Sequence, residues 1–296
     1  MNRPEPPADP GYVRQLSWHG EPAVEVRGDA ASLVVSPARG GKIVSLRDRT
    51  GREWLAQPAA DCPLPPPAEP GAVFTDAELC GWDECAPSIV ACPVAGAELP
   101  DHGELWTRRW WAQGGAAGVW APSFGYRFSR RIEPIPDGFA LHYEVAATDR
   151  SFPFLWAAHP QFLAPPGSEV VVDAGEVVWD VLPEPAEQLA WEPGLARLDT
   201  LPPGGCRKFY LPPERPVSAA ELRLADGHRL RFGWDERVLP YLGVWFDACR
   251  YSRENVVALE PSTAFYDSLE RAVAFGRVPT VHPGSPLTWT LSVTFA

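Results

Sequence analysis

Lysine is almost missing from this 296-residue chain, because only Lys42 and Lys208 occur among its 26 Lys and Arg residues. With abundant alanine, proline and glycine, the many arginines are typical of a codon bias rather than of a basic functional surface. No Lys/Arg block could neutralise a run of phosphates, and the formal net charge of -12 repels nucleic acids and anionic lipids. We therefore expect no nucleic-acid partner.

Long apolar runs are also missing. No segment is apolar for long enough to span a bilayer, and the proline-rich first residues lack the apolar stretch of a secretory signal. The sequence therefore predicts no membrane contact and a cytoplasmic protein, present as a monomer or a homodimer. We expect residues 1–11 to be disordered and residues 12–296 to form one domain.

Closely spaced pairs of cysteines are missing as well. The six cysteines are scattered and none forms a Cys-x-x-Cys pair, which disfavours both a disulfide framework and a zinc site. We expect free thiols and no bound metal.

Helical periodicity is scarce, whereas apolar residues recur at every second position. Residues 139–145 and 287–295 show this alternation clearly, and it is the period of a half-buried strand. The 35 prolines and 25 glycines provide many turns and exclude long helices. Only residues 265–275 have near-helical spacing. The pattern predicts an all-β protein, either a sandwich or a barrel.

Two polar residues stand in strongly apolar surroundings. His159 follows Trp156 and two alanines and precedes a proline, and Glu260 ends the run 256–259 just before Pro261. A buried imidazole or carboxylate has to be paired, hydrogen-bonded or used in chemistry. Burial would raise the pKa of the carboxyl group, as suits a general base. A satisfied core histidine is the alternative for His159.

A third candidate, His102, lies in a loop that its neighbours Pro100, Asp101 and Gly103 indicate. Loops carry functional residues more often than strands do. The 13 tryptophans offer flat apolar faces against which sugar C–H groups could pack, with core filling as the alternative for each. Several flank these candidates, namely Trp82, Trp106, Trp110, Trp111, Trp156 and Trp245.

A series of segments, in this order and over most of the chain, resembles motifs of the aldose 1-epimerase family in the galactose mutarotase-like superfamily. They are residues 36–46, 81–87, 100–103, 156–160, 241–245, 259–263 and 267–269. The resemblance implies an antiparallel β-supersandwich with a sugar site in a cleft on one sheet. It also implies interconversion of the α and β anomers of an aldose without a metal or cofactor.

The same resemblance implies roles for individual residues. His159 corresponds to the family's general acid and Glu260 to its general base, so that ring opening and closing proceed by proton transfer. His102 resembles the first family histidine, which holds a ring hydroxyl or assists at the ring oxygen. The candidate sugar contacts are Trp82, Asp83, Glu84, Arg108, Trp156, Trp245 and Asp247.

The sequence also departs from the family. The Asn-and-Arg segment and the His-rich Gly-Gly segment of galactose mutarotases are missing, and the Asp-His-Gly context resembles the branch that includes glucose-6-phosphate 1-epimerases. Three alternatives therefore stay open. The first is epimerisation of a phosphorylated or otherwise anionic sugar, with Arg108 and Arg109 as anion contacts. The second is sugar binding without catalysis. The third is a hydrolase or lyase, although hydrolysis usually needs two carboxylates.

Overall fold

The structure, a computed structural model, describes residues 12–183 and 185–296. The predicted disorder of residues 1–11 lies outside the described residues. Nearly all regular structure consists of β-strands that pair antiparallel, as the alternating apolar pattern requires. The all-β prediction is confirmed.

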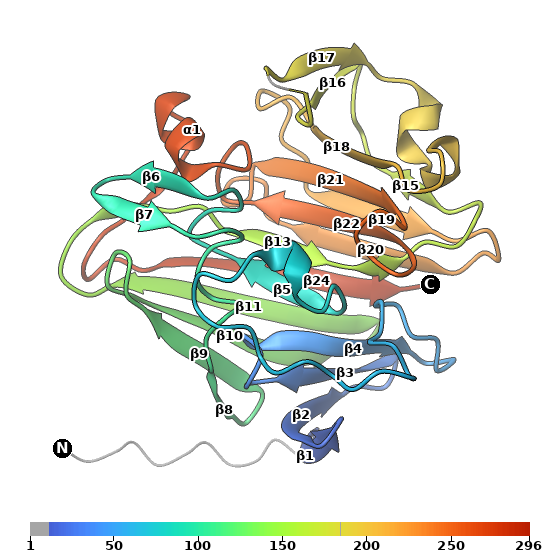
Figure 1. Ribbon diagram of the computed structural model, residues 1–296, viewed down its shortest axis with the longest axis horizontal. Coiled ribbons are helices and arrows are strands. Elements are labelled where there is room, and N and C mark those ends of the chain that lie inside the picture. The colour runs from blue at the N-terminus through green and yellow to red at the C-terminus, as the bar shows by residue number, and fades with distance from the viewer. Residues whose placement is uncertain (1–11, 184) are drawn as a thin grey trace.

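The larger sheet has 12 strands, and they include both the first strands of the chain and strands from its last third (Figure 1). Its strands are, in spatial order, β1 (Val13–Trp18), β2 (Glu21–Arg27), β3 (Ala31–Ser36), β4 (Lys42–Asp48), β5 (Trp82–Cys85), β13 (Ala157–Pro160), β22 (Asn255–Ser262), β21 (Tyr241–Ala248), β18 (Cys206–Tyr210), β16 (Val177–Asp180) and β17 (Glu187–Ala190), and β14 (Phe162–Leu163) also pairs with β22. Strands far apart in the sequence thus become neighbours at its centre.

The second sheet has eight strands. They are, in spatial order, β15 (Glu169–Val171), β19 (Ala219–Arg223), β20 (Arg229–Trp234), β24 (Leu287–Phe295), β11 (Gly138–Ala147), β10 (Tyr126–Ile135), β9 (Ala116–Ala121) and β8 (Trp111–Gln113). The alternating segments at residues 139–145 and 287–295 are the paired strands β11 and β24 of this sheet.

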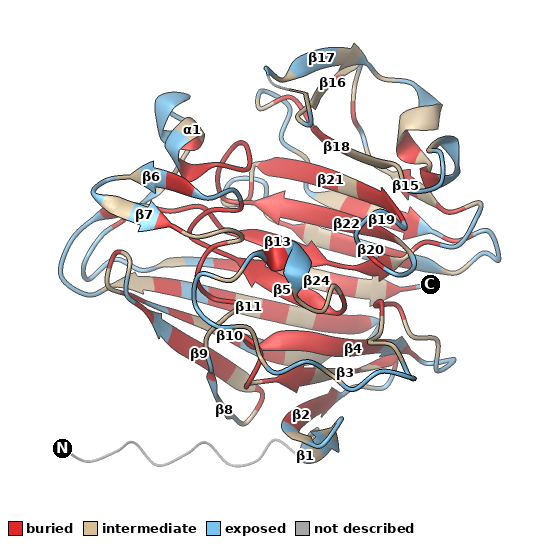
Figure 2. Ribbon diagram, in the orientation of Figure 1, coloured by how far each residue is buried: buried red, intermediate tan, exposed pale blue. Residues whose placement is uncertain are grey.

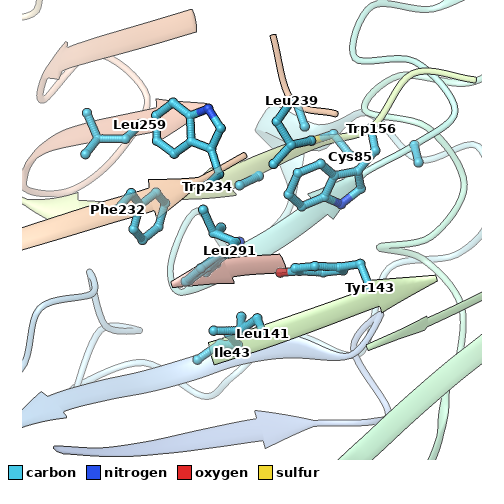
Figure 3. Packing of buried hydrophobic residues seen from close by; sticks show 14 of the residues in the cluster. Ile43, Cys85, Leu141, Tyr143, Trp156, Phe232, Trp234, Leu239, Leu259 and Leu291 are labelled. Atoms are coloured by element: carbon cyan, nitrogen blue, oxygen red, sulfur yellow. The ribbon is translucent and has the colours of Figure 1, made fainter. Parts of the chain in front are cut away.

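The hydrophobic core lies between these two sheets. Ile43 and Leu259 of the first sheet and Leu141, Phe232 and Leu291 of the second belong to one buried cluster (Figure 3). The central strands of the larger sheet are buried over most of their length, whereas those of the second sheet alternate between buried and more exposed residues (Figure 2). Burying this apolar surface is the main favourable term in folding.

The remaining elements are short. Two further pairs of strands occur: β6 (Cys92–Val94) and β7 (Ala97–Leu99) form a hairpin, whereas β12 (Phe152–Pro153) pairs with β23 (Thr280–Val281), which is distant in the sequence. The 3-10 helices are η1 (Phe74–Asp76), η2 (Pro193–Ala196) and η3 (Leu198–Thr200). The weak helical signal at residues 265–275 corresponds to α1 (Leu269–Ala274), which Ser268 caps by accepting from the Arg271 N–H at 3.4 Å.

Within residues 12–183 and 185–296, no helix combines the length and the apolar character that crossing a membrane requires. All six cysteines are free thiols.

Candidate functional site

One row of residues crosses the larger sheet and contains both buried candidates, His159 and Glu260. Asp83 on β5 pairs with His159 on β13, and Glu260 on β22 pairs with Gly243 on β21, which in turn pairs with Tyr210 on β18. The β13–β22 and β14–β22 pairs share one register, and this register places His159 opposite Glu260. Because directly opposed residues point to the same face of a sheet, the row lies together on the face away from the core.

His159 and Glu260 therefore face each other. His159 Nε2 lies 3.9 Å from Glu260 Oε1, while His159 Nδ1 is 3.4 Å from the side-chain nitrogen of Gln161. His159 is 6% exposed and Glu260 is 0% exposed. Among the described residues, Glu260 Oε1 has no hydrogen-bond partner. Burying a carboxylate oxygen without a hydrogen-bond partner costs free energy. Groups in such unfavourable surroundings are concentrated at functional sites.

A buried cluster of charges holds the other oxygen of Glu260. Lys208 Nζ lies 2.7 Å from Glu260 Oε2 and 2.8 Å from Asp267 Oδ1. The Tyr210 hydroxyl donates to the same Asp267 oxygen at 2.5 Å. The absent side chain at Gly243 makes room for this arrangement, because a Cβ there would lie 3.0 Å from Cζ of the Tyr210 ring.

Burial shifts the pKa values of the two facing groups in opposite directions. It raises the pKa of Glu260 to about 7, with attraction to Lys208 opposing the rise and repulsion from Asp267 adding to it. Burial lowers the pKa of His159 well below its usual value, and His102 and Lys208 add to this effect. Near neutral pH, His159 is therefore uncharged, and Glu260 is the group that exchanges a proton.

A cavity of about 210 Å³ opens beside this pair. Its polar wall includes His102, His159, Gln161, Lys208 and Asp267. Its apolar wall consists of Phe74, Leu79, Ile89, Val90, Leu182 and Trp245. Glu260 does not contribute to the lining; it lies behind His159 and Lys208, which do. The mixture of apolar surface and a few convergent polar groups is typical of a small-molecule site.

The loop that carries His102 is held in a tight conformation. His102 has a left-handed φ of 56° and Gly103 one of 72°, where a Cβ would lie 2.0 Å from the Ala86 carbonyl oxygen. Asp101 accepts from His102 Nδ1 and from the Phe74 N–H, both at 2.8 Å. Partial burial acts to raise the pKa of Asp101, but these hydrogen bonds outweigh it and lower this pKa.

These hydrogen bonds place the Phe74 ring against the two histidines. The Phe74 ring stacks on His102 at 3.9 Å between ring centroids and meets His159 edge to face at 5.2 Å. The centroids of the two imidazoles are also 5.2 Å apart, so the structure brings His102 beside His159.

Asp83 lies at one end of the row and is paired with Lys42, the other lysine of the chain. Lys42 Nζ is 3.1 Å from Asp83 Oδ2, and both side chains are almost fully buried. Burial raises the pKa of Asp83 to about 6 against the attraction of Lys42. Asp83 is therefore a neighbour of His159 but does not line the cavity.

Three of the residues that the sequence suggested as sugar contacts lie between the sheets instead. Glu84 forms a buried ion pair with Arg130 of β10 and accepts from Trp156 Nε1 at 2.8 Å and from the Tyr143 hydroxyl at 3.0 Å (Figure 3 shows Trp156 and Tyr143). Trp82 packs against Phe232, with 5.0 Å between ring centroids. Trp82, Glu84 and Trp156 are 0% exposed. Alternation along β5 turns Trp82 and Glu84 away from Asp83, and Trp156, which directly precedes β13, lies on the opposite side from His159.

The remaining predicted contacts are divided. Trp245 and Asp247 line the cavity, but the Asp247 carboxylate accepts from backbone N–H groups of the following turn, at 2.6 Å from Arg250 and 2.8 Å from Ser252. Arg108 pairs with Glu104 at 3.4 Å and does not line the cavity.

The sequence reasoning missed Lys208, Asp267, Phe74 and Gln161 as cavity residues. One signal for Lys208 was present, since it is one of only two lysines. Asp267 lay in a segment that resembled the family, but nothing in that segment indicated a role.

No protein-family model and no curated protein matches the chain. Solved structures match over nearly its whole length. The Slr1438 protein of Synechocystis sp. PCC 6803 is 15% identical with a TM-score of 0.73, covering 96% of this chain and 99% of its own. A galactose mutarotase-like protein of Clostridium acetobutylicum is 14% identical with a TM-score of 0.73, covering 96% and 98%. A protein of Escherichia coli K12, provisionally named an aldose 1-epimerase, is 16% identical with a TM-score of 0.68, covering 96% and 99%.

At these identities the likeness concerns the fold. It agrees with the resemblance that the sequence motifs carry and with the two antiparallel sheets described above. The chain has the galactose mutarotase-like β-supersandwich fold.

Proposed function

We propose that the protein is an aldose 1-epimerase, in which His159 and Glu260 transfer the protons of ring opening and closure. The observation that carries this proposal is the facing of His159 Nε2 and Glu260 Oε1 across 3.9 Å beside a cavity of about 210 Å³. This distance is too long for a direct hydrogen bond and too short for an atom to lie in line between the two groups, so a sugar oxygen would have to contact both from the side.

Anomerisation breaks the bond from C1 to the ring oxygen, rotates the exposed aldehyde and closes the ring again. The C1 hydroxyl must lose a proton and the ring oxygen must gain one, so the pair must hold a single proton. Proton transfer by a positioned side chain contributes on the order of 10² to 10⁴ in rate. Below about pH 7 the raised pKa of Glu260 keeps this proton on the carboxyl group of the free protein, and its transfer to His159 gives the carboxylate base and the imidazolium acid.

The cavity favours a neutral sugar over a phosphorylated one. Among the described residues that line it, no arginine is present, and the lysine that does line it is already paired with two carboxylates. A phosphate would meet no free cation there. The apolar wall, with Phe74 and Trp245, suits the C–H face of a sugar ring.

Polarimetry on freshly dissolved α-glucose and α-galactose tests the proposal, with glucose 6-phosphate as the anionic comparison. We expect anomerisation of a neutral aldose above the buffer rate, reduced on the order of 10² to 10⁴-fold by Glu260→Gln or His159→Asn. His142→Asn, which changes a histidine hydrogen-bonded to Thr290 on the other sheet, is the matched control. Wild-type rates in both site variants would contradict the proposal.

One observation favours a second candidate, a sugar-binding protein without catalysis. Glu260 is 0% exposed, and Lys208 lies against its Oε2 at 2.7 Å, so a sugar must move neighbouring groups to reach the carboxylate. Saturable sugar binding measured by calorimetry, with no anomerisation above the buffer rate, would support this candidate instead.

A further inference from the structure

The two lysines of the chain occupy equivalent settings on either side of His159. Lys42 is paired with Asp83 on the β5 side, and Lys208 is paired with Glu260 and Asp267 on the β22 side. Both ammonium groups are almost fully buried. In a chain that otherwise uses arginine at its basic positions, both retained lysines thus serve buried carboxylates next to one histidine.

A physical reason explains why arginine does not replace them. The ammonium group of lysine is compact and directs three N–H donors tetrahedrally, whereas the guanidinium group is a broad planar fork. Lys208 reaches carboxylates from two separate segments, Glu260 on β22 and Asp267 in the segment before α1. These two contacts use two of its donors, and the third is left for a group in the cavity that Lys208 lines.

We propose that Lys208 is a positioning residue, which clamps the Glu260 carboxylate beside His159 and governs the protonation of Glu260. This proposal rests on the proposed function for its catalytic consequence, but the clamp itself does not. By holding Oε2 at 2.7 Å, Lys208 turns the other oxygen, Oε1, toward His159. Asp267 and the Tyr210 hydroxyl in turn fix Lys208.

The groups around Glu260 act on its proton in opposite senses. Lys208 opposes protonation by attraction, whereas Asp267 favours it by repulsion. His159, the Tyr210 hydroxyl and the buried Cys85 thiol complete the titratable surroundings. Burial acts to lower the pKa of Lys208, but Asp267 and Glu260 outweigh it and raise this pKa, so Lys208 stays charged while Glu260 titrates.

Two lysines make a direct test possible. Protein labelled with 13Cε and 15Nζ lysine should give two side-chain NMR signals, assigned by Lys42→Arg. We expect the Lys208 signal to move with pH around a midpoint near 7, and to lose this transition in Glu260→Gln. Asp267→Asn should shift the midpoint down by roughly 1–3 pH units, because it removes a nearby like charge. The matched variant Asp83→Asn should affect the Lys42 signal and leave the Lys208 midpoint in place.

A second measurement links the clamp to catalysis. Lys208→Met, which keeps the length of the side chain without its charge, should shift the alkaline limb of the anomerisation profile up by roughly 1–3 pH units. Asp267→Asn should shift this limb down. A merely structural role would lower the rate equally at every pH.

The outcomes separate the two proposals. A Lys208 signal that ignores Glu260→Gln, or an unchanged midpoint in Asp267→Asn, would overturn the clamp whether or not the protein anomerises sugars. The expected NMR transitions in a protein without anomerase activity would support the clamp and refute the proposed function. If Lys208→Met does not fold, the NMR titrations of wild type and Asp267→Asn still decide the question.

Discussion

His159 and Glu260 lie opposite each other on adjacent strands β13 and β22, and their facing atoms, Nε2 and Oε1, are 3.9 Å apart. The strand register creates this relationship, because residues at directly opposed positions share one face of the sheet. Each side chain has a further contact that leaves its facing atom free, His159 Nδ1 with Gln161 and Glu260 Oε2 with Lys208.

The opposite pKa shifts of this pair predict a pH profile. Burial raises the pKa of Glu260 to about 7 and lowers that of His159 well below its usual value. The pair holds its single proton below about pH 7, and loses it as the pH rises further. We expect kcat/KM for anomerisation to fall above about pH 7, and to fall on the acid side only below the usual histidine range. A rate that instead rose through pH 7 would show that deprotonated Glu260 alone limits the reaction.

Gly243 predicts a steric effect on the site. In Gly243→Ala the new Cβ would lie 3.0 Å from the Tyr210 ring, which Asp267 holds through a 2.5 Å hydrogen bond. The ring cannot move without disturbing Asp267 and Lys208, so we expect a loss of about 1–3 kcal/mol in unfolding free energy and a reduced kcat. Urea unfolding and polarimetry would measure both.

Gly194→Ala is the matched control for this substitution. Its Cβ would make only ordinary contact, at 3.7 Å from the Thr200 methyl group. If the Gly243→Ala protein were as stable and active as the Gly194→Ala protein, the site would tolerate a side chain at position 243.

The buried Glu84–Arg130 pair predicts a large effect on stability. Both side chains are 0% exposed, and Glu84 also accepts from Trp156 and Tyr143. Glu84→Gln leaves the Arg130 charge without its counter-ion in the interior, which typically costs about 3–5 kcal/mol. Guanidinium unfolding should show this loss.

Glu133→Gln provides the comparison on the surface, where Glu133 pairs with Arg131 and both side chains are about half exposed. Exposed ion pairs contribute roughly 0–1 kcal/mol. Equal losses in the two variants would contradict the role of burial.

Phe74 predicts a change in the titration of His159. Its ring meets His159 edge to face at 5.2 Å and helps to exclude water, and burial is the main cause of the lowered pKa of His159. In Phe74→Ala we expect the pKa of His159 to rise toward its usual value, because the charged form regains solvent. The aromatic surface of the cavity also shrinks, so KM should rise. NMR titration of 15N-labelled histidine would follow the first effect.

Phe275→Ala removes a ring that is 54% exposed and belongs to no part of the cavity lining, and so serves as the control. An unchanged pKa of His159 in Phe74→Ala would show that groups other than Phe74 exclude water from the imidazole.

The sequence by itself determined the class of fold and the identity of the central pair. The period-2 pattern of residues 139–145 and 287–295 predicted strands that became β11 and β24, because alternation reflects one buried and one exposed face. The apolar surroundings of His159 and Glu260 marked them as buried polar groups, and the structure places them face to face.

Only the tertiary structure decided which residues lie on the same face of the sheet as His159 and Glu260. Asp83 and Glu84 are adjacent in the sequence, yet Asp83 lies beside His159 while Glu84 pairs with Arg130 between the sheets. The order of strands in the sheet brings Lys208 close to Glu260, and a loop brings Asp267 to Lys208. Neither feature can be recognised from the local sequence. Residue type and period are local properties of a chain, whereas the charges that tune a buried carboxylate come from whichever strands the fold brings alongside it.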